Sequence, residues 1–163
     1  MKNLLTIRSL QAHEAPVISE LAMRSKSFWG YSDVFMDACR EELTVTELDI
    51  VSTDLHYWVA ESGSEILGFY AIEKLTHDKF ELEALFVEPD FIGTGVGKAL
   101  IEHAKQLVKK LDGNRLIIQG DPNAQKFYVA AGGKLIGKKA SASIPGRSLP
   151  LFEIDLVTIE IAD

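Results

Sequence analysis

Residues 82–111 read LEALFVEPDFIGTGVGKALIEHAKQLVKKL, an apolar run followed by a glycine-rich loop and an amphipathic helix. The glycines Gly93, Gly95 and Gly97 let backbone N–H groups approach an anion without a Cβ atom in the way. The helix that follows places the positive end of its dipole at the same point. This stretch therefore predicts an anion-binding loop, with a phosphate group as the expected ligand.

Two common glycine signatures do not fit this loop. A mononucleotide P-loop would need a glycine in place of Ile92 and a hydroxyl residue in place of Ala99. A dinucleotide signature begun at Gly93 would need a glycine in place of Lys98, and it normally follows the first strand of a domain. These departures disfavour ATP, GTP or a dinucleotide as the ligand.

The stretch from Leu85 to Leu100 resembles the phosphate-binding motif of the GNAT superfamily of acyl-CoA-dependent N-acyltransferases. The motif usually carries Gln or Arg where this chain has Ile92, but the cradle works mainly through backbone groups. A second segment, Asp121–Gly133, resembles the family pattern Asp/Asn-x-Asn-Ala-x-x-Phe-Tyr-x-x-x-Gly-Phe, with Gly133 in place of the last aromatic residue.

The resemblance implies a mixed α/β fold with a central, mostly antiparallel sheet, flanked by helices, and a parallel split between the fourth and fifth strands. We expect residues 1–163 to form a single domain of this kind. Acetyl-CoA is expected in the split, between the strand ending at Val87 and the strand Arg115–Gln119. The residue pattern predicts strands at 4–10, 56–61, 66–74, 79–87, 115–119, 134–144 and 149–159, and helices starting at 16, at 32 or 33, and at 96, with a short one inside 121–133.

The resemblance also implies how acetyl-CoA binds as the co-substrate. The loop N–H groups hold the pyrophosphate, and the strand before the loop pairs its backbone with the pantetheine arm like an added strand. The residues assigned to this site are Leu85, Phe86, Val87, Ile92, Gly93, Thr94, Gly95, Val96, Gly97, Lys98, Asn123 and Phe127.

Two residues are candidates for catalysis. By family position, Tyr128 lies near the sulfur of CoA and acts as the acid, since a phenol with a pKa near ~10 suits a leaving thiolate; the alternative is a core tyrosine. Glu81 and Glu83 lie two apart on one strand and are expected on the face shared by Leu85 and Val87. Glu83 is the first choice for the base because it is closer to the cofactor end, and a solvent-facing glutamate is the alternative.

Composition excludes several classes of protein. The net charge of −7 argues against a nucleic-acid partner and fits a cationic substrate. No apolar run approaches the ~20 residues that cross a bilayer, and the lone Cys39 suits a reducing compartment. The four histidines lack metal-ligand spacing. We expect a cytoplasmic protein without a membrane or metal partner.

The activity implied by the resemblance is N-acetylation of a primary amine on a small molecule, by direct attack on the acetyl-CoA thioester. Two alternatives stay open: a protein or peptide acceptor, and a non-catalytic acyl-CoA-binding regulatory module. Phe28, Trp29 and Tyr31 suit either the wall of an amine pocket or the core, and Arg147 suits either a substrate carboxylate or solvent. A homodimer paired through an exposed last strand is also possible.

Overall fold

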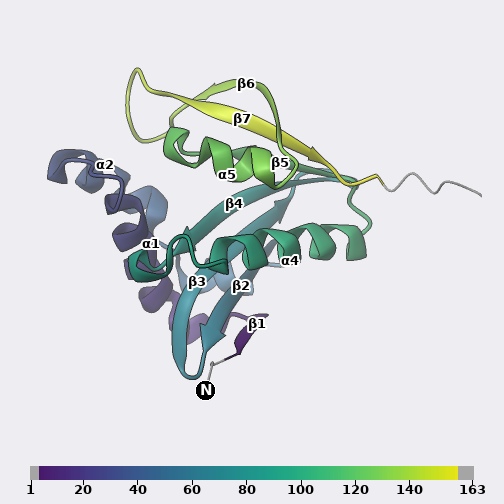
Figure 1. Ribbon diagram of the computed structural model, residues 1–163, viewed down its shortest axis with the longest axis horizontal. Coiled ribbons are helices and arrows are strands. Elements are labelled where there is room, and N and C mark those ends of the chain that lie inside the picture. Colours follow the sequence, from purple (N-terminus) through teal and green to yellow (C-terminus); the bar gives the residue numbers. More distant parts are fainter. Residues whose placement is uncertain (1–3, 158–163) are drawn as a thin grey trace, which may run out of the picture.

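Seven strands form one sheet in the order β1-β2-β3-β4-β5-β7-β6 (Figure 1). The computed structural model describes residues 4–157. Neighbouring strands are antiparallel except for the parallel pair β4–β5, which confirms the predicted mixed α/β fold. The strands are β1 (Leu5–Ser9), β2 (Leu55–Ser62), β3 (Glu65–Lys74), β4 (Lys79–Val87), β5 (Arg115–Gln119), β6 (Lys134–Ala140) and β7 (Ser148–Asp155). The helices are α1 (Ala15–Ser27), α2 (Asp33–Leu43), α3 (Glu47–Val51), α4 (Val96–Lys110) and α5 (Gln125–Ala130), with 3₁₀ turns at Ala12–Glu14, Pro89–Phe91 and Pro122–Ala124.

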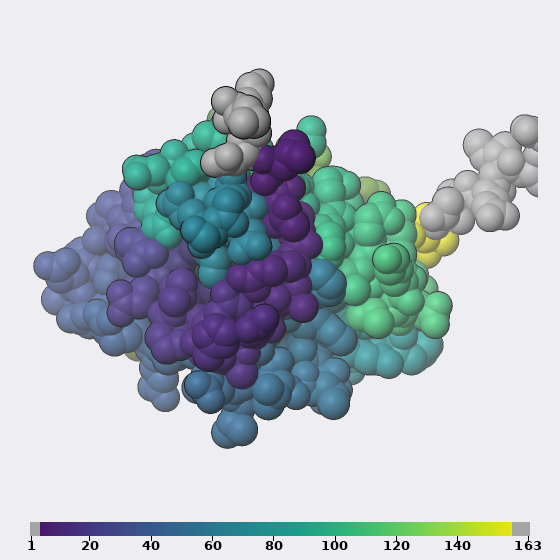
Figure 2. All heavy atoms as spheres, turned by 90° about the horizontal axis from the view of Figure 1, so that it is seen from below, coloured from purple at the N-terminus to yellow at the C-terminus, as the bar shows by residue number. Residues whose placement is uncertain are grey.

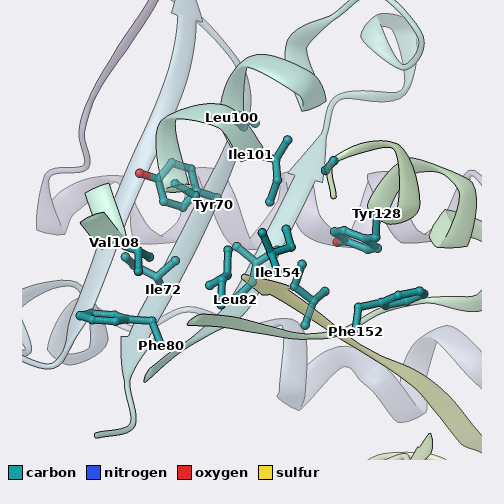
Figure 3. Close-up of a cluster of buried hydrophobic side chains, with 14 of the residues drawn as sticks. Tyr70, Ile72, Phe80, Leu82, Leu100, Ile101, Val108, Tyr128, Phe152 and Ile154 are labelled. Atoms are coloured by element: carbon teal, nitrogen blue, oxygen red, sulfur yellow. The ribbon is translucent and has the colours of Figure 1, made fainter. Parts of the chain in front are cut away.

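Each face of the sheet carries its own hydrophobic core. On one face, α4 buries Leu100, Ala104 and Val108, and α5 adds Tyr128 (Figure 3). On the other face, residues of α1 pack against β2 and β3. The helical spacing that predicted an amphipathic α4 is thus confirmed. Among the described helices, none combines the length and apolar character needed to cross a bilayer.

Most predicted elements are present with shifts of a few residues at their ends. Helix α2 begins after Ser32, whose Oγ accepts a hydrogen bond from the Phe35 N–H at 3.1 Å. Helix α3 was not predicted, although Thr46 and Asp49 form a capping box at its start. The last predicted strand is β7, and its predicted final residues, 158 and 159, lie outside the described part of the chain.

The sheet edges differ from the expected arrangement. Strand β7 pairs with β5 on one side and β6 on the other, so the last strand is not exposed as predicted. The two edges are β6 and β1, and the N-terminal residues, purple in Figure 2, lie on the surface there. A homodimer stays a prediction, but its proposed contact through the last strand is wrong.

Strands β4 and β5 pair along a short ladder and then diverge. The paired residues run from Lys79 to Leu82 on β4 and from Arg115 to Ile118 on β5. Beyond this ladder, backbone groups of β4 that face β5 have no partner on that strand. This divergence is the split that the family resemblance implied between these two strands.

A β-bulge in β4 lies at the start of the split. Ala71 of β3 faces Ala84, and the next residue, Ile72, faces Leu82, which leaves Glu83 as the extra residue. A bulge reverses the alternation of side chains beyond it. Leu82 therefore shares a core with Leu85 and Val87. Glu81 lies on the opposite face. Glu83 bonds to Glu73, the residue opposite Glu81, and so lies on that face as well. The prediction that both glutamates share the face of Leu85 and Val87 is wrong.

Candidate active site

A cavity of about 680 Å³ lies where β4 and β5 diverge. It extends along β4 from the glycine loop to the bulge at Glu83. The predicted site residues that line it are Glu83, Leu85, Phe86, Val87, Ile92, Gly93, Gly95, Gly97, Lys98, Asn123, Phe127 and Tyr128. The side chains of the other two do not reach it: Val96 is buried in the core, and the Thr94 hydroxyl donates to the Phe91 carbonyl oxygen.

The glycine loop adopts a conformation that other residues rarely take. Gly93 has φ +83° and Gly95 has φ +98°, both in the left-handed region. A Cβ atom at either position would meet nothing within 4 Å, so the space over the loop is open. Helix α4 begins at Val96, directly after this turn. The open loop and the helix N-terminus together fit a phosphate ligand.

The backbone of β4 beyond the bulge is only partly free to bind an extended ligand. The Val87 N–H donates a hydrogen bond to the Ser25 Oγ of α1 at 3.2 Å. Ser25 is 7% exposed and also lines the cavity. A buried N–H needs a partner, and a serine on the neighbouring helix supplies one here.

Glu83 lies in the wall of the cavity at the bulge. It remains accessible to solvent, yet the concave wall removes much of its hydration. This desolvation, a hydrogen bond with Glu73 and the charges of Glu81 and Glu73 raise the pKa of Glu83 to about 8. In its ionised form, a carboxylate with this pKa accepts a proton more readily than an ordinary glutamate, and the ionised fraction grows as pH rises through 8.

Tyr128 lies across the split from β4, on α5. Its side chain is 7% exposed and packs against the rings of Phe127 and Phe152, with centroids 5.2 and 5.8 Å away. A Cβ atom at Gly120 would come within 3.0 Å of its ring, so glycine is needed there. Burial, with a smaller effect from the Asp121 charge, raises the pKa of Tyr128 and keeps its phenol protonated. The two catalytic candidates thus line one cavity from opposite sides of the split.

The part of the cavity away from the glycine loop is acidic. Its walls come from β3, β4, α3 and the end of α2. They include the carboxylates of Glu42, Asp49, Glu73, Glu81 and Glu83. An ammonium group entering from this side finds a favourable electrostatic environment.

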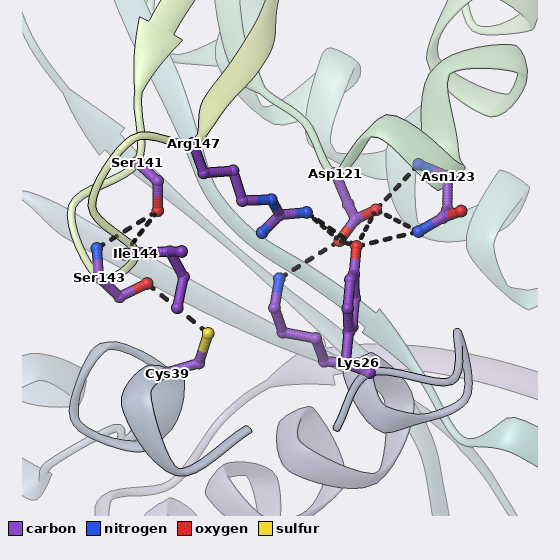
Figure 4. A network of polar contacts seen from close by, with 9 residues as sticks. Lys26, Cys39, Asp121, Asn123, Ser141, Ser143, Ile144 and Arg147 are labelled. Carbon is purple, nitrogen blue, oxygen red and sulfur yellow. Dashed lines mark hydrogen bonds and ion pairs between the residues drawn. The ribbon is translucent and has the colours of Figure 1, made fainter. Parts of the chain in front are cut away.

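A polar network connects the two sides of the split (Figure 4). We call it the Tyr31 network; its members are Lys26, Tyr31, Asp121, Asn123 and Arg147. The Tyr31 hydroxyl donates to Asp121 Oδ2 at 2.8 Å and accepts from Asn123 Nδ2 at 2.9 Å and Arg147 Nη2 at 2.8 Å. Lys26 Nζ and Arg147 Nη2 lie 3.3 and 3.6 Å from Asp121 Oδ2.

The charge states in this network are well defined. Burial favours the neutral form of Asp121, but the hydrogen bonds from the Asn123 N–H and from Tyr31, with the charge of Lys26, lower its pKa. Burial and the neighbouring Asp121 raise the pKa of Tyr31 to about 12. The network is therefore built on a carboxylate and a neutral phenol at neutral pH.

The sequence patterns predicted the glycine loop but gave no sign of this network. Tyr31 and Asp121 lie 90 residues apart, and no local spacing signals that they meet. The Arg147 side chain is 18% exposed and donates to Tyr31, so the hypothesis of a solvent-exposed Arg147 is wrong. Arg147 also lines the cavity, and its binding of a substrate carboxylate stays a prediction. Trp29 does line the cavity, whereas Phe28 is half exposed.

His103 and Cys39, two other side chains that could be reactive, pack against neighbouring side chains. His103 Nδ1 lies 2.7 Å from the Tyr70 hydroxyl and packs near Trp58. Cys39 is fully buried on α2, with its Sγ 3.6 Å from the Ser143 Oγ. Within residues 4–157, no three potential metal ligands come together in a group.

Comparison with known proteins agrees with this geometry. The family model described as the acetyltransferase (GNAT) domain matches residues 15–141. The chain is 31% identical over 126 residues to the peptidyl-lysine N-acetyltransferase YiaC of Escherichia coli K12, covering 77% of this chain and 81% of that protein. It is 30% identical over 135 residues to the peptidyl-lysine N-acetyltransferase YjaB of Salmonella typhimurium, covering 82% and 87%. The fold matches the PaiA N-acetyltransferase of Thermoplasma acidophilum, crystallised with coenzyme A, with a TM-score of 0.78, 21% identity and coverage of 93% and 99%.

Proposed function

Because this chain belongs to the GNAT family of acetyl-CoA-dependent N-acetyltransferases, we propose that its acceptor is the side-chain amine of a lysine in a protein or peptide. The observation that carries this proposal is the single cavity that joins the glycine loop to an acidic end. The two relatives near 30% identity act on peptidyl-lysine, which favours this acceptor over the small-molecule amine expected first.

The glycine loop is the proposed site for the pyrophosphate of acetyl-CoA. Gly93 and Gly95 leave open space above their backbone, and α4 adds its N-terminal dipole. From Ala84 to Val87, β4 pairs with β3 on one side but not with β5 on the other. The backbone on this second side is the proposed partner of the pantetheine arm. Bound acetyl-CoA supplies the thioester, whose C–S bond breaks as the new C–N bond forms to lysine.

Glu83 and Tyr128 are the proposed proton-transfer groups. Glu83 takes a proton from the lysine ammonium, directly or through one water, and its raised pKa suits this role. Tyr128 donates its proton to the leaving thiolate, and its burial keeps that proton in place until then. The nitrogen loses two protons on the way from ammonium to amide. Glu83 takes the first and later releases it to solvent, and the second, lost as the tetrahedral adduct collapses, returns through water to the tyrosinate. Each turnover thus releases one proton to solvent and restores both groups.

The test is acetyl transfer to a lysine peptide whose N-terminus is blocked. Thiol release from acetyl-CoA that depends on this peptide, with acetylation of the lysine by mass spectrometry, supports the proposal. A panel of small primary amines is assayed alongside. Turnover of the small amines without any turnover of lysine peptides would overturn the proposed acceptor.

A further inference from the structure

The Tyr31 network joins the two sides of the split, where β4 and β5 no longer pair. Helix α1, which carries Lys26, packs against β4. Asp121 follows β5, and Arg147 directly precedes β7 on the other side of the split. Since the β4–β5 ladder ends at Leu82 and Ile118, side chains rather than backbone hydrogen bonds link the two sides here.

Tyr31 is at the centre of these contacts. A hydroxyl has one donor and two acceptor positions, and in Tyr31 all three are used, by Asp121, Asn123 and Arg147. Its ring stacks on Phe35 at 4.1 Å with an interplanar angle of 13°. The Arg147 guanidinium lies 5.2 Å from the centre of the Tyr31 ring. Both the position and the hydroxyl of Tyr31 are therefore fixed.

The partners of Tyr31 form part of the cavity wall. Lys26, Asp121, Asn123 and Arg147 all line the cavity, whereas Tyr31 itself does not. The Asp121 charge also acts on Tyr128, which places the network beside the proposed reacting end of the cavity. Tyr31 can thus influence the cavity through these four residues without touching a substrate.

We propose that Tyr31 is a positioning residue that sets acceptor selectivity by holding the two sides of the split at a fixed separation. The cavity then accepts an unbranched primary amine and disfavours an amine with extra bulk at nitrogen. This inference rests on the proposed function, because a lysine side chain is the slender acceptor it invokes. In pockets of fixed shape, one added carbon atom changes kcat/KM by about 10–200-fold.

The test compares two peptides that differ by one methyl group, with lysine in one and Nε-methyllysine in the other. In Tyr31→Phe the ring and its stacking remain, but all three hydroxyl hydrogen bonds are lost. We expect the preference for lysine over methyllysine in kcat/KM to fall about tenfold. Arg147→Gln removes the guanidinium that donates to the Tyr31 hydroxyl from the loop before β7, so it should reduce the same preference.

The matched control is Tyr70→Phe, which removes a hydroxyl bonded to His103 outside the cavity wall. Partial unfolding lowers the rates for both peptides by the same factor, so it leaves the ratio unchanged. An unchanged ratio in Tyr31→Phe, or an equal change in Tyr70→Phe, would overturn the inference. If the wild-type protein acetylates no peptide, the proposed function fails, and the inference is tested instead with butylamine and N-methylbutylamine.

Discussion

The Ser25 Oγ on α1 accepts the hydrogen bond of the Val87 N–H, 3.2 Å away at the end of β4. This hydrogen bond links α1 to the side of β4 that lines the cavity. It also satisfies a backbone group that would otherwise point into the split without a partner. An extended ligand lying along β4 would compete for the same N–H group.

This contact predicts an unusual stability effect of Ser25→Ala. The variant leaves the Val87 N–H without a partner in the ligand-free protein, which should lower the free energy of unfolding by ~1–3 kcal/mol. If the pantetheine arm pairs with β4, acetyl-CoA can supply a new acceptor. The rise in Tm on adding acetyl-CoA should then be larger for the variant than for the wild-type protein, as measured by differential scanning fluorimetry.

Ser19→Ala is the matched control for this experiment. Ser19 is on the same helix, and its Oγ accepts a hydrogen bond from the Val45 N–H at 2.8 Å. Its loss should also lower Tm, but acetyl-CoA should not restore it. Equal ligand-induced shifts in both variants would show that the arm does not pair with this part of β4.

Glu83→Gln tests the proposed base. The variant should lower kcat/KM for the amine by about 10²–10⁴, the usual contribution of general acid–base catalysis. In the wild-type protein the rate should rise with pH through about 8, the pKa that burial and Glu73 give to Glu83. This limb should be missing from the pH–rate profile of the variant. In Glu73→Gln the rise in rate should occur at a lower pH, because Glu73 no longer raises the pKa of Glu83. A rise at the same pH as in the wild-type protein would mean that Glu73 does not act on Glu83.

The same pKa shift predicts how stability depends on pH. Folded protein holds the Glu83 proton up to about pH 8, whereas an unfolded chain releases it near 4.5. Between these values the folded state binds more protons, so this group's contribution is fully present below pH 4.5 and is lost as pH rises through 8. The Tm of Glu83→Gln relative to the wild-type protein should therefore increase from pH 5 to pH 9. A constant difference would mean that Glu83 titrates normally.

Tyr128→Phe separates binding from catalysis. The ring lies among Phe127, Phe152 and Gly120, so removing the hydroxyl alone should preserve its packing. We expect acetyl-CoA affinity to be unchanged by isothermal titration and kcat to fall by about 10²–10⁴. Full activity in this variant would assign Tyr128 to the core alone.

Gly95→Ala tests the anion-binding loop. The φ of +98° at Gly95 disfavours alanine by ~1–2 kcal/mol, although there is room for its methyl group. If the loop must keep this conformation to bind the pyrophosphate, acetyl-CoA affinity should fall about tenfold. Gly63→Ala has a comparable positive φ of +63° in the β2–β3 turn and equal room, so it should lower Tm without affecting that affinity.

Local patterns predicted the parts of the structure that depend on local physics. The glycine loop, α4 and the strands of the sheet follow from spacing and turn residues, and the structure confirms them. The bulge at Glu83 could not be predicted, because alternation gives no sign of one extra residue in a ladder. It is this bulge that separates Glu81 from Leu85 and Val87. The short helix α3 could have been found from the capping box at Thr46 and Asp49.

The glycine-loop side of the candidate site was predicted, and the Tyr31 network was missed. Residues of the glycine-loop side are close in sequence, within the loop and the strand before it. The Tyr31 network instead joins α1, the turn after β5 and the β6–β7 loop. These contacts depend on tertiary packing of distant segments, which a single sequence does not encode in any local spacing.

Lysine acetylation by this protein is tested most directly by mass spectrometry of an N-terminally blocked lysine peptide after incubation with acetyl-CoA and either wild-type protein or Glu83→Gln. We expect a single acetyl group on the lysine Nε with the wild-type protein and a strongly reduced yield with the variant. An unmodified peptide with the wild-type protein, alongside acetylated small amines, would contradict the claim that this chain is a lysine acetyltransferase. Equal yields from both proteins would contradict the role of Glu83.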